Sequence, residues 1–241
     1  LWGGTRFEIT SDPRAPGIIS TISLAVACIL SLYAIESSDG KTISGVMEIT
    51  GFGRFMSMVF TAALAITAAA SIYRIPSTKI TVDDAKDADE RTTLSLMDNR
   101  RQVDLHILLM MVALGMSLMA LSTNLFFLIV CLELASMASY VLVGFHKESR
   151  IGGEAGAKYF IVGSIASATG IYGMSLLYLW AGSLDFASLS ASWAAMDTLD
   201  PLAGIGVGLM LVAFGFKVSA APFHLAAPDA YSGTNAPIAG M

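Results

Sequence analysis

Apolar residues fall into long runs that are separated by shorter polar segments. The runs are residues 17–35, 55–73, 105–121, 125–145, 159–179 and 201–221. A transmembrane helix needs about 20 mainly apolar residues, so each run predicts one membrane-spanning helix. Only three residues separate the third run from the fourth, which predicts a tight helical hairpin. Residues 1–241 are therefore expected to form a single all-α, polytopic membrane domain with about six visible transmembrane helices.

The polar segments predict how this bundle is oriented. Most of the 14 Lys and Arg residues lie in residues 1–16, in the long segment 74–104 and between the fourth and fifth runs. By parity these three segments share one side of the membrane, and only Lys41 and Arg54 lie on the other side. Because positive residues are enriched in cytoplasmic loops, the rich side is expected to be cytoplasmic. Residues 74–104 are expected to form a solvated cytoplasmic loop.

Composition excludes several classes of protein. Hydrophobic residues make up 55% of the chain and charged residues 14%, whereas soluble domains carry roughly 25% charged residues. A net charge of −5 argues against a nucleic-acid partner. Cys28 and Cys131 both fall in apolar runs, which argues against a disulfide framework or a metal site. We interpret them as small buried hydrophobic residues.

Two ionisable residues lie deep inside apolar runs. Glu133 lies in the fourth run and Lys217 in the sixth. A charge in hydrocarbon costs about 2.5–3.5 kcal/mol on insertion scales, and such residues commonly mark ion or proton paths. Ser136 and Tyr140 follow Glu133 at i+3 and i+7, which predicts a polar stripe on one helix face. The alternative for Glu133 is a hydrogen-bonded acid that only fixes helix pairing.

The last run has an unusual end. Gly204-xxx-Gly208 permits a close helix contact, and Pro222 follows Lys217 by five residues. Proline removes a backbone donor and clashes with the preceding turn, so the helix is expected to break near Pro222. Broken helices at membrane depth line cavities where their ends act on ions. The alternatives are a snorkelling Lys217 and an interfacial His224.

The remaining ionisable residues near the runs are assigned to the membrane boundary. Lys158 lies at the edge of the fifth run, where hydropathy alone favours a snorkelling side chain. His106 and His146 lie at the ends of runs and are interpreted as interfacial.

Three motifs carry a family resemblance. They are LELASMASYVL at residues 132–142, GGEAGAKYFIVGSIASATGIYGMSLLY at 152–178 and GFKVSAAPFHLAAPDAYSG at 215–233. In order and spacing they resemble the antiporter-like membrane subunit of respiratory complex I, called subunit N in bacteria and subunit 2 in mitochondria. The resemblance extends to related dehydrogenases such as the archaeal deazaflavin-linked enzyme.

The resemblance implies roles for four residues. Glu133 corresponds to the acid on the family's fifth helix, and Lys217 to the central lysine of the broken seventh helix. Lys158 belongs to the KYF motif of the sixth helix, and His224 follows the Pro-Phe of the break. Together they would form a proton relay. The resemblance also implies that this chain is part of a roughly 14-helix subunit, with one helix before Leu1 and about seven after Met241.

The function that the resemblance implies is proton translocation in a redox-driven NADH:quinone-type oxidoreductase, or one driven by a reduced deazaflavin. This chain would hold no cofactor, and other subunits would carry flavin, iron–sulfur clusters and a quinone-like acceptor. Its partners would be other membrane subunits, the lipid bilayer and protons, with no nucleic acid. It would be a multi-pass protein of a prokaryotic plasma membrane.

Two alternatives stay open, and the sequence also departs from the family pattern. Leu225-Ala226-Ala227 stands where the family often has Trp, and Ser232 where it often has Glu, which indicates a divergent branch. One alternative is a subunit of a multisubunit sodium/proton antiporter, although the Pro-Asp-x-Tyr-x-Gly stretch favours the complex I branch. The other is a membrane scaffold whose buried charges only fix helix pairing.

Overall fold

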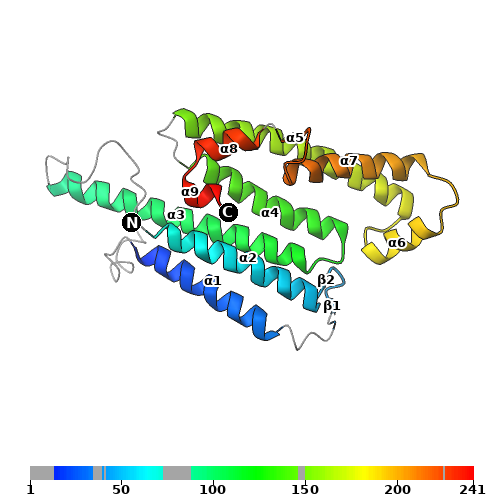
Figure 1. Ribbon diagram of the computed structural model, residues 1–241, viewed down its shortest axis with the longest axis horizontal. Coiled ribbons are helices and arrows are strands. Elements are labelled where there is room, and N and C mark those ends of the chain that lie inside the picture. The colour runs from blue at the N-terminus through cyan, green and yellow to red at the C-terminus, as the bar shows by residue number, and fades with distance from the viewer. Residues whose placement is uncertain (1–13, 35–39, 41, 73–87, 146–149, 225) are drawn as a thin grey trace.

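The chain folds into an elongated bundle of helices (Figure 1). The computed structural model describes residues 14–34, 40, 42–72, 88–145, 150–224 and 226–241, with the backbone alone for 88–100. The long helices are α1 (Ala15–Ala34), α2 (Gly51–Ala70), α3 (Ala88–Ala120), α4 (Leu125–Val143), α5 (Arg150–Ala181) and α7 (Pro201–Lys217). The shorter elements are α6 (Phe186–Ala194), α8 (Ala227–Gly233), α9 (Ala236–Ala239) and the antiparallel pair β1 (Thr42–Ile43) and β2 (Met47–Glu48).

The bundle is that of a multi-pass membrane protein. Within the described ranges, α1, α2, α4, α5 and the segment Arg101–Ala120 of α3 are long and apolar enough to cross a membrane. The sixth predicted span, residues 201–221, is shorter, because α7 ends at Lys217 after 17 residues. At 1.5 Å per residue α7 is about 26 Å long, slightly less than the roughly 30 Å of a hydrocarbon core. The prediction of an all-α membrane bundle whose last helix is broken is confirmed.

The prediction of a loop over residues 74–104 is wrong for its second half. Helix α3 begins at Ala88, well before the apolar run, and is 33 residues long. The sequence from Ala88 to Leu114 contains no proline or glycine and is rich in Leu, Met and Arg, which favour helix. Hydropathy detects only the part of a helix that is apolar, so it missed this extension. Residues 73–87 lie outside the described part of the chain, as do residues 1–13 of the predicted N-terminal segment.

The predicted hairpin between the third and fourth spans is confirmed, and a side-chain cap closes it. The Asn124 carboxamide oxygen accepts hydrogen bonds from the backbone N–H groups of Phe126 and Phe127 at the start of α4. This is the bonding that an N-cap asparagine supplies to otherwise unpaired donors. The small β1–β2 hairpin bonds to the same turn, with Glu48 N–H donating to the carbonyl of Leu121 at 2.9 Å.

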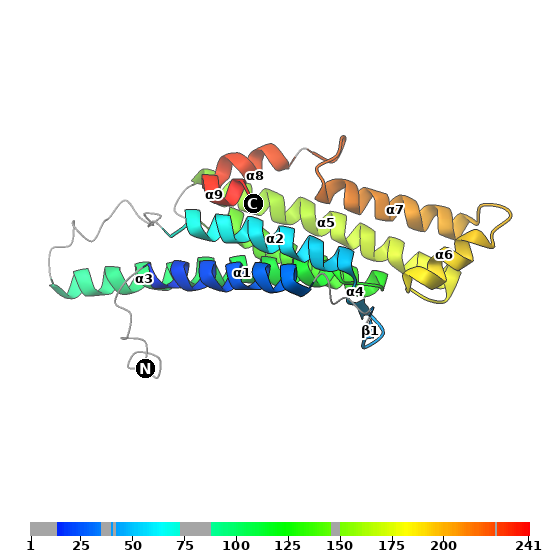
Figure 2. The same ribbon diagram turned by 60° about the horizontal axis from the view of Figure 1, so that its bottom comes forward.

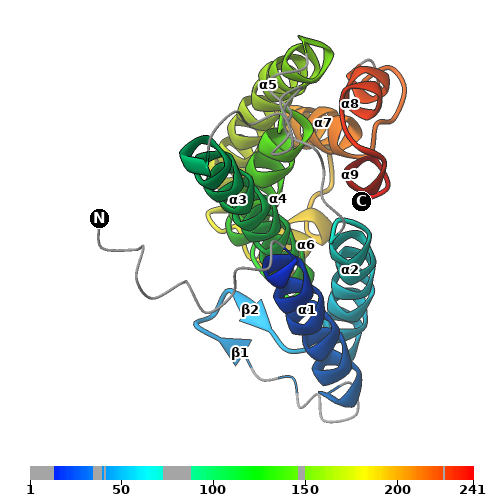
Figure 3. The same cartoon turned by 90° about the vertical axis from the view of Figure 1, so that its left-hand side faces the viewer.

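Helix α4 lies between two packed groups of helices. On one side α1, α2 and α3 share a core with α4 that includes Leu64, Leu109 and Leu142. On the other side α4, α5 and α7 share a second core that includes Ile129 and Met210. Figures 2 and 3 show the arrangement, with α5, α7 and α8 on one side of the bundle and α1 and α2 on the other. A polar side chain of α4 that points toward either group of helices is therefore enclosed by protein.

Helices α5 and α7 touch through glycines, though not through the predicted pair. A Cβ on Gly206 would meet the Gly173 carbonyl at 3.1 Å, and one on Gly173 would meet the Gly206 carbonyl at 2.8 Å. Gly204 instead faces Leu199, and Gly208 has nothing within 4 Å. The buried face of α7 is Ala203, Gly206, Met210, Ala213 and Phe216. That register turns Gly204 and Gly208 away from α5, so the predicted Gly204-xxx-Gly208 contact is wrong.

Candidate functional site

The two ionisable residues inside the apolar runs form an ion pair. The Lys217 Nζ lies 3.2 Å from Glu133 Oε1, and their side chains are 14% and 25% exposed, respectively. Glu133 lies in the middle of α4, whereas Lys217 is the last residue of α7. The pair therefore joins a continuous helix to the point where a neighbouring helix stops.

Lys217 is held by three oxygen atoms on one face of α4. Besides Glu133, its ammonium donates to Ser136 Oγ at 2.7 Å and to Tyr140 Oη at 3.1 Å. The Tyr140 ring centroid is 5.5 Å from Nζ, within the range of a cation–π contact. An ammonium has three N–H donors, so every donor has an acceptor here. The polar stripe predicted at 133, 136 and 140 is the surface that receives Lys217.

The end of α7 brings Lys217 to this surface. The backbone N–H of Val218 donates to the Phe214 carbonyl, and that of Ser219 donates to the Phe216 carbonyl. These bonds satisfy carbonyls of the last turn, and the helix ends at Lys217. Ser219 then takes a positive φ of 51°, which turns the chain out of the helical path. A cation in the last helical turn also interacts favourably with the helix dipole. Residues 218, 219 and 221–224 form turns, as expected around Pro222.

Sequence reasoning missed one member of the site, Ser167 on α5. Its hydroxyl donates to Glu133 Oε1 at 2.6 Å, to the same oxygen that Lys217 contacts. A serine within an apolar helix commonly bonds to its own backbone, so its presence alone gives no signal. The small residues Gly163, Ala166 and Gly170 mark the buried face of α5. That face was the only clue that Ser167 lies near the packed interior.

An aromatic cluster packs around the ring of Tyr140. The Tyr140 ring packs edge-on against Tyr159 at 4.8 Å and against Phe160 at 5.9 Å. Tyr159 in turn lies 6.2 Å from Phe216 on α7. Gly163 makes room for this arrangement, because a Cβ there would collide with the Tyr140 ring and hydroxyl. The position of Tyr140 thus depends on the absence of a side chain on α5.

The structure places Lys158 and His224 outside the pair. Lys158 is half-exposed and binds two carboxylates, Glu154 at 2.8 Å on its own helix and Asp229 at 3.1 Å on α8. His224 is exposed in the segment between α7 and α8. Because the helix stops at Lys217, the shared face that a continuous helix would give Lys217 and His224 is not formed.

The other predicted boundary and core residues have different outcomes. His106 is buried, 3% exposed, and its Nδ1 lies 2.9 Å from Ser20 Oγ on α1, so its ring packs inside the bundle, and its interfacial depth stays a prediction. The extension of α3 toward Ala88 moves His106 into the packed part of the helix. His146 lies outside the described residues. Cys131 is buried and Cys28 partly buried, as predicted.

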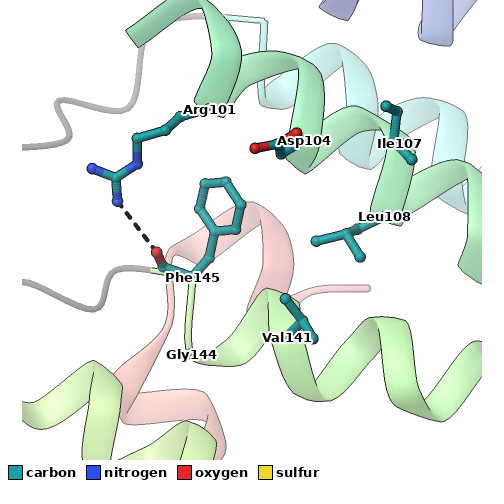
Figure 4. A pocket seen from close by; sticks show the side chains of 7 residues that line it. All are labelled: Arg101, Asp104, Ile107, Leu108, Val141, Gly144 and Phe145. Carbon is teal, nitrogen blue, oxygen red and sulfur yellow. Dashed lines mark hydrogen bonds between the residues drawn. The ribbon is translucent and has the colours of Figure 1, made fainter. Parts of the chain in front are cut away.

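A pocket of about 430 Å³ lies between α3 and the end of α4, away from the pair (Figure 4). Arg101 donates to the Phe145 carbonyl at 3.3 Å across its mouth. Ile107, Leu108 and Val141 supply an apolar wall. Neither Glu133 nor Lys217 lines this pocket, so it does not belong to the ion-pair site.

Comparison with known sequences identifies the relatives of this chain. Residues 122–241 match the family described as "NADH:quinone oxidoreductase/Mrp antiporter, TM". Over 220 residues the chain is 33% identical to the NADH-quinone oxidoreductase subunit N of Sphingopyxis alaskensis, covering 90% of this chain and 40% of that protein. The chain spans about two fifths of the length of the curated relatives it matches.

Solved structures give the same relationship. A chain of respiratory complex I from Thermus thermophilus with bound aureothin superposes with a TM-score of 0.70 at 25% identity, over 94% of this chain and 44% of that one. A chain of the Mrp complex from Dietzia sp. gives 0.69 at 19% identity, over 96% and 41%, and shows a shared fold. The resemblance indicated by the three sequence motifs is confirmed.

Proposed function

We propose that this chain, whose residues 122–241 match the NADH:quinone oxidoreductase/Mrp antiporter membrane family, is part of a proton-translocating subunit N in a redox-driven, complex I-like oxidoreductase. The observation that carries the proposal is the enclosed ion pair between Glu133 and Lys217 at the broken end of α7. Electron transfer would take place in other subunits, which would hold the flavin, iron–sulfur clusters and quinone-like acceptor. This chain would contribute the proton path.

The arrangement around Lys217 supports two positions for its side chain. Coulombic attraction between opposite charges holds the pair closed, so a change in the charge of either partner changes the position that Lys217 prefers. When Glu133 is neutralised by a proton, Lys217 loses its anionic partner. It then keeps only the two neutral acceptors, Ser136 and Tyr140. Lys217 can then swing away and release its proton to the part of the subunit beyond this chain.

The energy scale of such a change matches what a pump must overcome. A membrane potential of about 150 mV corresponds to about 3.5 kcal/mol per charge. Breaking a buried ion pair by removing one partner costs about 3–5 kcal/mol. The partial exposure of Glu133 and Lys217 places their pair below the upper end of that range. The energy of the pair is therefore comparable to the energy needed to move one charge against the membrane potential, and the pair can still open.

Lys158 and His224 are proposed to act at the margin of the path. Both are exposed, His224 in the segment that leads to α8 and Lys158 beside Asp229 of α8. From there they would exchange protons with water near the broken helix, without contacting Lys217 directly. The side of the bundle that carries Lys158 and Arg150 would face the cytoplasm, in agreement with the distribution of positive charge. The bacterial relatives favour a prokaryotic plasma membrane.

The test uses the complete subunit in its assembled complex, reconstituted in vesicles. We expect Glu133→Gln and Lys217→Ala each to abolish proton translocation through this subunit while the complex still assembles. Glu154→Gln, which neutralises a half-exposed acid on α5, is the matched control and should pump normally. Near-normal pumping by an assembled Lys217→Ala complex would favour the scaffold instead. Proton movement that needs a sodium gradient but no electron transfer would favour the antiporter.

A further inference from the structure

Ser167 differs from most helical hydroxyl groups of this bundle in what it bonds to. Ser139 and Thr169 donate to the carbonyl four residues before them, as does Ser136. Ser167 instead donates across helices to Glu133. A hydroxyl that is not engaged with its own backbone is free to respond to the charge on its partner.

The two donors of Glu133 meet at one of its two carboxylate oxygens. Ser167 and Lys217 both contact Oε1, at 2.6 and 3.2 Å. Within the described part of the chain, Oε2 accepts no hydrogen bond, and the Glu133 side chain is 25% exposed. A carboxylate oxygen with two donors has little capacity left for a proton, whereas its partner oxygen is open.

The elements that carry these donors differ in how they are fixed. Ser167 lies in the middle of α5, a continuous helix of 32 residues. Lys217 is the last residue of α7 and has a non-helical segment after it. In the proposed relay, Lys217 would therefore be the partner that leaves when the pair opens, and Ser167 would stay with Glu133.

We propose that Ser167 is a positioning residue that keeps Oε1 of Glu133 occupied and directs the transferred proton to Oε2. This inference rests on the proposed proton-relay function and adds the atom at which the proton binds. With the ion pair closed, Oε1 receives Ser167 and Lys217. After a proton binds Oε2, Oε1 becomes the carbonyl oxygen of the acid, and the Ser167 hydroxyl continues to donate to it. No other covalent bond changes.

The test combines infrared spectroscopy with transport in the assembled complex. The C=O stretching band of protonated Glu133, assigned by its loss in Glu133→Gln, should move to higher frequency in Ser167→Ala, because the carbonyl loses its hydrogen bond. Proton translocation should fall about threefold to tenfold, the effect of losing one ordinary intramolecular hydrogen bond. Ser167→Thr, which restores a hydroxyl, should return both the band and the rate toward the wild type.

Ser175→Ala is the matched control, because Ser175 lies on the same helix and donates to the backbone carbonyl of Tyr172. It should change neither the band nor the rate. If Ser167→Ala leaves the band in place while Glu133→Gln and Lys217→Ala still abolish transport, the inference about Ser167 is overturned and the proposed function stands. If Glu133→Gln itself transports protons normally, the proposed function fails.

Discussion

Within the described residues, Lys217 and Lys158 each pair with acidic side chains, but their surroundings differ. Lys217 contacts one carboxylate and two neutral hydroxyl groups, and its side chain is 14% exposed. Lys158 contacts two carboxylates, and its side chain is 51% exposed. Water screens the second cluster, so exposed ion pairs of this kind contribute little. The comparison shows that enclosure and neutral partners, rather than an acid beside a base, distinguish a candidate relay from a surface ion pair.

The neutral partners give the interior cluster a second property. Among the described residues, Lys158 bonds only to its two acids, so the position of its ammonium depends on them alone. Lys217 keeps Ser136 and Tyr140 when Glu133 is neutralised. A buried cation that keeps only neutral partners has lost its charge compensation, so it is held less firmly and can leave the site. The predictions below test this difference by altering those partners.

Among substitutions that leave Glu133 and Lys217 themselves unchanged, the largest effect is expected from filling the space beside Tyr140. Gly163→Ala places a methyl group against the Tyr140 ring and hydroxyl, so Tyr140 must shift away from Lys217. Overpacking of this kind costs about 1–3 kcal/mol. We expect a loss of proton translocation of more than tenfold and a lower midpoint of thermal inactivation of the complex.

The matched control for this substitution is Gly153→Ala on the same helix. A Cβ at Gly153 meets nothing within 4 Å. Alanine also favours helix over glycine by about 1 kcal/mol. This variant should pump normally and be at least as stable as the wild type. If Gly163→Ala and Gly153→Ala translocate protons equally well, the position of Tyr140 does not affect transport.

A smaller effect is expected from separating α5 and α7. Gly173→Ala brings a methyl group within 2.8 Å of the Gly206 carbonyl and of Leu209 Cβ, which pushes α7 outward. Lys217 would then lie farther from α4, and proton translocation should fall several-fold with a modest loss of thermal stability. Gly208→Ala, on the open face of α7, should leave both quantities unchanged. Pairs of cysteines introduced on α5 and α7 would measure the displacement, because their cross-linking yield should fall in Gly173→Ala.

The smallest effect is expected from removing one neutral acceptor. Ser136→Ala takes away the shortest contact of Lys217 but leaves Glu133 and Tyr140. A hydrogen bond to a charged group contributes about 1.5–3 kcal/mol, and the remaining partners offset part of it. The rate of proton translocation should drop about threefold. Ser139→Ala, whose hydroxyl bonds only to the Ala135 carbonyl on the same helix, should have no effect.

The sequence predicted the parts of this site that follow from the free-energy cost of a charge, or of a broken helix, inside a membrane. Glu133 and Lys217 were found because charges are expensive in apolar runs, and Pro222 marked the break because it cannot continue a helix. The stripe of Ser136 and Tyr140 followed from helical periodicity. These signals are local, so they can be read before any tertiary contact is known.

The parts that the sequence could not predict depend on the rotation of one helix against another. Ser167 bears no charge, and its donation to Glu133 exists only because α5 turns that face toward α4. In the same way, the rotation of α7 turns Gly206, rather than Gly204 or Gly208, toward α5. The polar start of α3 was missed for another reason, since helix formation there does not require an apolar run.

The central claim is tested most directly by comparing the two lysines in the assembled complex. Lys217→Ala and Lys158→Ala would each be measured for protons translocated per electron pair in sealed vesicles, with assembly checked on the same samples. The account predicts that Lys217→Ala loses the share of protons that this subunit carries, whereas Lys158→Ala retains most of it. Equal losses in both variants, or unaltered translocation in Lys217→Ala, would contradict it.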